Sequence, residues 1–237
     1  FLPALFTFWI RRKVEEPAIW KKISVSRDPK SKKDKPRLSE IFRPPYLKRT
    51  IITTALNTGT MFAWWGLFTW IPAYLALPPQ EGGMGLDIVR TSTWIIIMQV
   101  GMWLGYISFG FICDKIGRKK TYIIFLFSAS LLVMIYSSIR DNIVLLFFSP
   151  FLAFFGTGYF SGFGTITAEI FPTRIRASAQ GFTYNIGRGL SAIAPFTIGS
   201  LAKTYGLSPA FYLTAFFFFV SGVIAFSLPE TKGKELD

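Results

Sequence analysis

The chain has 237 residues, of which 51% are hydrophobic and only 16% are charged, whereas charged residues make up about 25% of a typical soluble domain. So little polar surface excludes an ordinary soluble fold of this size and indicates a membrane protein. The net charge of +13 does not predict a nucleic-acid partner, because the Lys and Arg residues flank apolar runs, as residues beside membrane spans do.

Several kinds of chemistry lack their usual residues. The sequence contains no His and a single cysteine, Cys113, which excludes an internal disulfide, a cysteine-based metal site and a Ser-His-Asp hydrolase. It contains no phosphate-binding loop that would couple ATP to movement. We therefore expect neither an enzyme nor a resident metal or cofactor.

Residues 1–10 form an apolar stretch that is followed at once by Arg11, Arg12 and Lys13. This stretch is half of the roughly 20 residues that cross a bilayer. We interpret it as the end of a preceding transmembrane helix, and the chain as the back half of a longer protein. A short helix lying in the membrane interface is the alternative.

Residues 11–49 are predicted to form a basic central loop on the cytoplasmic side. They hold many of the 26 Lys and Arg residues together with several prolines, and such a composition cannot bury an apolar core. A short amphipathic piece at Leu38–Phe42 is expected to lie in the membrane interface.

Six long apolar runs define a predicted transmembrane bundle over residues 50–228, followed by a cytoplasmic tail at 229–237. Each run has roughly the 17–25 residues of a spanning helix, or slightly more, and none alternates as a barrel strand would. The predicted fold class is an all-α membrane protein with six transmembrane helices. The predicted spans are Ile51–Leu77, Thr93–Cys113, Thr121–Ile139, Ile143–Ala168, Ala177–Ala202 and Leu207–Leu228.

An even number of spans places both ends of the bundle on one side of the membrane. Of the 26 Lys and Arg residues, only Arg90, Arg140 and Lys203 fall on the other side, and Arg188 falls inside a span. Because Lys and Arg accumulate in cytoplasmic loops, we predict that both ends are cytoplasmic and that the protein lies in the plasma (inner) membrane.

Aromatic residues near the predicted span ends indicate an interfacial belt. We place Tyr74 and Tyr122 in it, with Trp70, Trp94 and Tyr205.

The loop between the second and third spans reads GFICDKIGRKK over residues 110–120. We expect Gly110 to let two helices approach closely and Gly117 to permit the tight turn. Asp114 is placed to pair with a neighbouring cation or a helix N-terminus. The pattern Gly-x-x-x-Asp-x-x-Gly-Arg-Lys resembles the signature loop of the major facilitator superfamily, which lies between the second and third spans of each six-helix half.

Two further stretches support this resemblance. AEIFPTRIRA follows the fourth span and LPETKG follows the last one, and both resemble motifs of sugar porters and metabolite–proton symporters. VEEPAIW loosely resembles the Pro-Glu-Ser-Pro-Arg stretch of those proteins, but Val14 and Ala18 replace its first Pro and its Arg. The resemblance implies that the chain is the C-terminal six-helix half of a twelve-helix carrier, whose N-terminal half is its partner.

The resemblance also implies a gating role for charges on the cytoplasmic side. In such carriers, similar residues form ion pairs that latch helix ends together in one state of alternating access. The alternative is that these are ordinary positive-inside and helix-capping residues. The candidates for gating are Asp114, Arg118, Glu169, Arg176 and Glu230, with Arg174 beside them.

Arg188 is the one charged residue inside a predicted span. An arginine near the bilayer centre costs at least about 2.5–3.5 kcal/mol unless it is solvated or paired, and no Asp or Glu lies within the spans. We therefore expect a cavity that holds water and a small anionic substrate. A guanidinium suits a carboxylate, which it can bind through two hydrogen bonds.

Other polar residues stand on helix faces that could line this cavity. Gln180, Tyr184 and Arg188 follow one another at intervals of four residues, so they share one face, and Pro195 is expected to kink the same helix. Helix packing is the alternative role for these polar positions. The substrate-binding candidates are Arg188, Asn185, Tyr184, Asn57 and Gln99.

Together these observations predict a secondary active transporter that moves a small organic acid or a sugar-like metabolite by alternating access. Coupling to a proton is implied by the resemblance alone, because the spans contain no carboxylate. The alternatives are a uniporter or exchanger, and a membrane sensor or receptor built on a carrier fold. A membrane-embedded enzyme is disfavoured by the missing histidine.

Overall fold

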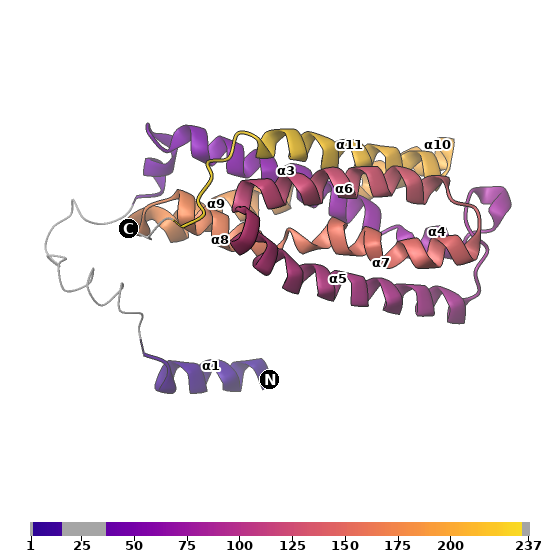
Figure 1. The fold of residues 1–237 in the computed structure, drawn as a ribbon, viewed down its shortest axis with the longest axis horizontal. Coiled ribbons are helices and arrows are strands. Elements are labelled where there is room, and N and C mark those ends of the chain that lie inside the picture. Colours follow the sequence, from indigo (N-terminus) through magenta and orange to yellow (C-terminus); the bar gives the residue numbers. More distant parts are fainter. Residues whose placement is uncertain (1, 16–36, 234–237) are drawn as a thin grey trace, which may run out of the picture. The chain divides into compact units, whose positions relative to one another are not determined.

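The computed structural model describes residues 2–15 and 37–233, and every regular element among them is a helix (Figure 1). The chain divides into two compact units, residues 1–37 and 38–237. The prediction of an all-helical fold is therefore confirmed for the described part of the chain. Residues 16–36 of the predicted basic loop lie outside it.

The first unit contains helix α1, Leu2–Lys13. This helix continues past its expected end at residue 10 through three cations. The guanidinium of Arg12 lies 4.3 Å from the centre of the Phe8 ring, one turn earlier, and cations in a last turn interact favourably with the helix dipole. These two interactions explain the extra turn.

The second unit begins with a short 3₁₀ helix, η2 (Leu38–Phe42), at the position where the sequence predicts an amphipathic piece. Figure 1 shows the long helices α5, α6, α7 and α11 running in roughly the same direction. In chain order, the elements after η2 are α3 (Leu47–Phe68), α4 (Ile71–Ala76), η3 (Pro79–Glu81), α5 (Ile88–Ile116), α6 (Arg118–Ser138), α7 (Asn142–Gly158), α8 (Ser161–Ile170), α9 (Thr173–Ser191), α10 (Ala194–Tyr205) and α11 (Leu207–Ala225).

Four stretches of the described chain are long and apolar enough to span a membrane. They are Ile88–Ile116, Arg118–Ser138, Asn142–Ile170 and Leu207–Ala225. The chain is therefore part of an integral membrane protein that crosses the bilayer more than once. The third of these stretches contains two helices, α7 and α8. The other two predicted spans also consist of two helices in succession, α3 with α4 and α9 with α10.

Both interruptions coincide with a proline. Pro72 lies in the first turn of α4 and Pro195 in the first turn of α10, and proline lacks the N–H group that would continue the preceding helix. The kink expected at Pro195 is therefore present, as a break after Ser191. Trp70 links the two breaks, because its Nε1 donates a hydrogen bond to the carbonyl of Pro195 at 2.9 Å.

Capping aspartates determine where two of the long helices begin. The side chain of Asp87 accepts a hydrogen bond from the backbone N–H of Arg90 at 2.9 Å, so α5 starts five residues before the predicted span. Asp141 accepts one from the N–H of Val144 at the same distance and starts α7. An aspartate at this position satisfies an otherwise unpaired N–H of the first turn.

Helices α5 and α7 pack backbone against backbone through two glycines of α5. A Cβ at Gly101 would lie 2.3 Å from the carbonyl oxygen of Pro150, and one at Gly105 would lie 2.5 Å from that of Phe154. Gly110 was predicted for this role, but no atom lies within 4 Å of its Cβ position. That prediction is wrong because Gly110 stands on a different face of α5.

Two tyrosines assigned to the interfacial belt are instead fully buried. The hydroxyl of Tyr122 donates to the carbonyl of Tyr159 at 2.8 Å, and the hydroxyl of Tyr74 accepts from Nη1 of Arg140 at 3.2 Å. A buried tyrosine needs a partner for its hydroxyl. Here the partners are Tyr159, in the turn between α7 and α8, and Arg140, in the loop between α6 and α7, so sequence position alone could not reveal this burial.

After α11, the chain turns back across the end of the bundle toward α8 and the start of α6 (Figure 1). Residues 114–118, 169–176 and 229–233 therefore lie together. We call this end of the second unit the charged end, and the end with the α4–α5 and α6–α7 loops the opposite end.

The glycines of α5 give a matched test of this packing. Gly101→Ala would push a methyl group into the α7 backbone, and we expect it to destabilise the protein by about 1–3 kcal/mol, the usual effect of overpacking. Gly110→Ala adds the same methyl group to open space and should stabilise α5 by about 0.5–1 kcal/mol, because alanine favours the helix. Thermal unfolding in detergent compares the two variants, and a lower midpoint for Gly110→Ala than for Gly101→Ala would contradict the packing described.

Candidate functional site

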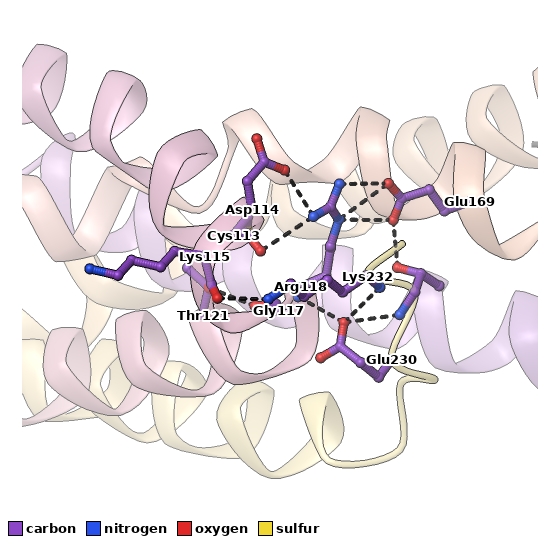
Figure 2. Close-up of polar contacts among 10 residues, drawn as sticks. Cys113, Asp114, Lys115, Gly117, Arg118, Thr121, Glu169, Glu230 and Lys232 are labelled. Atoms are coloured by element: carbon purple, nitrogen blue, oxygen red, sulfur yellow. Dashed lines mark hydrogen bonds and ion pairs between the residues drawn. The ribbon is translucent and has the colours of Figure 1, made fainter. Parts of the chain in front are cut away.

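Arg118 is the centre of the charged end (Figure 2). Its guanidinium lies 3.1 Å from Oε1 of Glu169 on α8 and 2.9 Å from Oδ1 of Asp114 on α5. It also donates to the carbonyl of Cys113, near the end of α5, at 3.3 Å. One side chain thus joins the start of α6 to the ends of α5 and α8.

The two ion pairs of Arg118 differ in burial and therefore in strength. The side chains of Arg118 and Glu169 are 15% and 11% exposed, whereas that of Asp114 is 73% exposed. An exposed pair contributes about 0–1 kcal/mol, but removing one partner of a buried pair costs about 3–5 kcal/mol. Glu169 is therefore the partner that holds Arg118, and most of the Asp114 carboxylate remains accessible.

Helix dipoles add to the attraction between Arg118 and Glu169. Arg118 is the first residue of α6 and Glu169 lies in the last turn of α8. Cations are disfavoured at a helix N-terminus and anions at a C-terminus. Each side chain therefore stands at the helix end that disfavours its charge, and each neutralises the other.

Glu230, in the tail, caps α6 from a distant part of the sequence. Its Oε1 accepts a hydrogen bond from the backbone N–H of Arg118 at 2.9 Å (Figure 2). The residue before α6 is Gly117, which has no side chain for capping and has φ of +102°. A Cβ at Gly117 would lie 2.5 Å from Oε2 of Glu230, so both backbone geometry and space require glycine there.

The same contacts determine the ionisation of Glu230. Burial favours a higher pKa for this carboxyl, but the backbone N–H groups of Lys232, Arg118 and Thr231 outweigh it and lower the pKa below its ordinary value of 4.5. All three N–H groups donate to Oε1, at 2.9–3.0 Å. Hydrogen bonds from N–H groups stabilise the charged form of a carboxyl.

Two other tail residues secure this arrangement, and sequence reasoning assigned neither of them a role. The hydroxyl of Thr231, which is buried, donates to Oε2 of Glu169. Nζ of Lys232 donates to the carbonyl of Lys115 at 2.7 Å, at the end of α5. The LPETKG motif named the right segment, but its contacts depend on the chain turning back after α11.

Arg176 does not join the predicted cluster. Its Nε donates to the carbonyl of Phe171 at 3.4 Å, and it has no acidic partner among the described residues. Arg174 instead forms an ion pair with Glu40 of η2. Nη1 of Arg49 donates to the carbonyl of Ile170 at 2.8 Å. Arg49 and Arg176 therefore cap the C-terminal carbonyls of α8, which the helix dipole favours.

A second site lies between α3, α8 and α9. This polar cavity has a volume of about 340 Å³ and is lined by Asn57, Phe163, Gln180, Tyr184 and Asn185, among others. Asn57 is only 4% exposed, and its side-chain amide makes no hydrogen bond within the described residues. The nitrogen and oxygen of this amide are not among the fully buried polar atoms, so they open into the cavity, where a water molecule or a ligand can bind them.

The residues from α9 differ in how freely they face the polar cavity. Nε2 of Gln180 donates to the carbonyl of Gly164 on α8 at 2.7 Å, so this side chain holds two helices together. Nδ2 of Asn185 donates to the carbonyl of Gly181, one turn earlier, at 2.7 Å. Tyr184 is 37% exposed and packs edge-on against Phe163. Of the face predicted from the sequence, Gln180 and Tyr184 line the cavity together with Asn185 beside them.

Arg188 lies one turn beyond Tyr184, in the last turn of α9. It is exposed, and its guanidinium makes no ion pair or hydrogen bond with the described residues. Its neighbour Gly187 packs against α3, where a Cβ would lie 2.7 Å from Cβ of Asn57. Arg188 therefore stands beside the α3–α9 contact, close in sequence to the polar cavity but outside its lining.

Gln99 is not brought to the polar cavity. It lies on α5, which packs mainly against α7 and α6, and its side chain is exposed. The structure thus groups Asn57, Tyr184 and Asn185, and leaves Gln99 and Arg188 outside that lining.

Comparison with known sequences identifies the family. A sequence model of the Major Facilitator Superfamily matches residues 75–236, which is more than half of the chain. The chain belongs to the major facilitator superfamily. Membership in this family of transporters confirms the resemblance carried by the GFICDKIGRKK loop and agrees with the expectation that the chain is not an enzyme.

Relatives within the superfamily cover nearly the whole chain. The cis,cis-muconate transport protein of Acinetobacter baylyi is 32% identical over 231 residues, which are 94% of this chain and 53% of that protein. The sialic acid transporter of Escherichia coli (strain K12) is 26% identical over 232 residues, 96% of this chain and 54% of that protein. The chain spans about half the length of the curated relatives it matches.

A solved structure of another transporter has a similar fold. The peptide transporter POT in complex with sulfate matches 76% of this chain and 37% of that chain, with a TM-score of 0.64. Its sequence is 22% identical, so the likeness concerns the arrangement of the helices alone.

The capping role of Glu230 predicts a pH dependence of stability. Because folding lowers the pKa of this carboxyl, its contribution is fully present above the unfolded pKa, near 4.5, and is lost as pH falls through the folded pKa. The thermal midpoint of the native protein should exceed that of Glu230→Gln at pH 6, and the difference should shrink as pH falls below about 4.5. Glu81→Gln, at the opposite end, controls for the loss of one exposed carboxylate. A difference between native protein and Glu230→Gln that grows toward acid pH would contradict the capping role.

Proposed function

We propose that the chain is the C-terminal half of a secondary transporter that moves a small carboxylate across a membrane by alternating access. In this proposal α3 with α4 and α9 with α10 are two further spans, each broken at its proline, so the half has six. Carriers commonly place their substrate beside such discontinuous helices. The charged end is then the cytoplasmic end, as its concentration of Lys and Arg favours.

The observation that carries this proposal is the unmet demand for polar partners around the polar cavity. The amide of Asn57, in the cavity lining, and the guanidinium of Arg188, beside the contact between α3 and α9, both lack partners among the described residues. A carboxylate can satisfy both groups, because it accepts from an amide N–H and takes two hydrogen bonds from a guanidinium. The cavity's aromatic wall, with Phe163 and Tyr184, favours a substrate with a flat apolar part.

The names of relatives are consistent with this substrate class. Muconate and sialic acid, which name the two relatives described above, are both carboxylic acids. A niacin transporter of Acinetobacter baylyi, 24% identical over 211 residues, adds a third carboxylic acid. The proposal is therefore an organic-acid carrier.

The charged end supplies the proposed latch. Arg118, Glu169 and Glu230 hold α5, α6, α8 and the tail of this half together. The Asp114 carboxylate is largely exposed, so it is the group in this cluster that can contact the partner half. Coupling to a proton requires a titratable carboxyl near the substrate, and we propose that the N-terminal half provides it, because every acidic residue of the described bundle lies at a helix end or in a loop.

Uptake by the whole carrier that contains this chain tests the substrate assignment. We expect Arg188→Gln to raise KM for the transported carboxylate about 10–100-fold, because a charge-assisted hydrogen-bonded contact is worth about 1.5–3 kcal/mol. Arg188→Lys keeps the charge but loses the paired hydrogen bonds. Its KM should therefore lie between that of the native carrier and that of Arg188→Gln.

Arg90→Gln is the matched control, because it removes the same side chain at an exposed position of the opposite end. It should leave KM unchanged. An Arg188→Gln carrier that takes up the carboxylate with native KM would refute the assignment.

A further inference from the structure

The charged end contains a basic cavity that none of the roles above uses. It has a volume of about 310 Å³, within the range of ligand pockets, and lies where the starts of α3 and α6 meet the end of α11. Its cations are Lys48, Arg49 and Lys119, and its apolar wall includes Ile52, Phe226 and Leu228.

The two lysines of the basic cavity stand in unfavourable positions. Lys48 is the second residue of α3 and Lys119 the second residue of α6. A cation in the first turn of a helix is disfavoured by the helix dipole. Arg118, the neighbour of Lys119, escapes this penalty by pairing with Glu169, but neither lysine has an acidic partner among the described residues.

No acidic side chain lines the basic cavity to relieve this charge. Glu230 lies nearby, but its Oε1 already accepts three backbone N–H groups and it is not part of the lining. Arg49 uses Nη1 for the carbonyl of Ile170, which leaves its remaining N–H groups for another acceptor. An anion bound here would therefore satisfy three cations and face the N-terminus of α3, whereas Glu230 already caps that of α6.

The apolar wall indicates what kind of anion this is. Phe216, Phe219, Val223 and Phe226 are exposed along α11 at intervals of three or four residues, so they form one apolar stripe. Because α11 is long and apolar enough to span a membrane, we expect this stripe to face lipid chains. It ends at Phe226 in the wall of the basic cavity.

We propose that the basic cavity binds an anionic phospholipid, with its phosphate between Lys48, Arg49 and Lys119 and an acyl chain along the apolar stripe of α11. Basic pockets at the ends of membrane helices bind such headgroups. A soluble anion would match the cations but would leave the stripe without a role. The site is separate from the polar cavity, so it serves stability or regulation rather than transport chemistry.

Lipid binding by the purified 237-residue chain tests this proposal. The chain in detergent is titrated with phosphatidylglycerol and, separately, with phosphatidylcholine of the same acyl chains, and bound lipid is counted by native mass spectrometry. Each Lys near a membrane anion contributes about fivefold to the affinity for an anionic lipid. The Lys48→Gln/Lys119→Gln variant should therefore bind phosphatidylglycerol about 30-fold more weakly than the native chain, and phosphatidylcholine binding should not change.

The matched control is Lys115→Gln/Lys120→Gln, which removes two lysines from the same end, outside the basic cavity. Its affinity for phosphatidylglycerol should stay within about twofold of that of the native chain. Should the first double variant fail to fold, each single variant should still weaken binding about fivefold. Equal phosphatidylglycerol affinities of the two double variants would refute the proposed site. Inorganic phosphate and glycerophosphoglycerol are tested beside the lipid, and if either bound as tightly as phosphatidylglycerol, the lipid assignment would be overturned.

Discussion

The pairing of Arg118 with Glu169 is the interaction on which the charged end depends. Each residue sits at the helix terminus that disfavours its charge, α6 at its start and α8 at its end, and each is largely buried. Neither could stand there alone, because an unpaired buried charge costs several kcal/mol. The tail completes the arrangement when Glu230 caps α6 and Thr231 reaches Glu169. Helices α5, α6 and α8 and the tail therefore form a single hydrogen-bonded unit.

The same reasoning separates satisfied from unsatisfied groups elsewhere in the bundle. Arg49 and Arg176 each cap the end of α8, where cations are favoured. Lys48, Lys119, Arg188 and the amide of Asn57 have no such partner within the described chain. The first two line the basic cavity, and the last two lie in or beside the α3–α9 contact, so the proposed lipid site and the proposed substrate site use separate groups.

The sequence predicts those features that depend on residues close together in the chain. Apolar run length located the helices, Pro195 located a break, and the GFICDKIGRKK loop identified the family. Prediction failed where the answer depends on which faces meet. Gly110 was chosen for close packing, but α5 meets α7 through Gly101 and Gly105. Arg176 was assigned to the ion-pair cluster, yet it caps α8. The cap that Glu230 gives α6 joins residues 112 positions apart, and no local pattern encodes that contact.

The most direct test is a pair of double-mutant cycles on Arg118, measured as free energies of unfolding in bicelles. One cycle combines Arg118→Gln with Glu169→Gln, and the other combines Arg118→Gln with Asp114→Asn. We predict a coupling energy of about 2 kcal/mol or more for Glu169, because that pair is buried, and below about 1 kcal/mol for exposed Asp114. Equal coupling in the two cycles, or none with Glu169, would contradict this account.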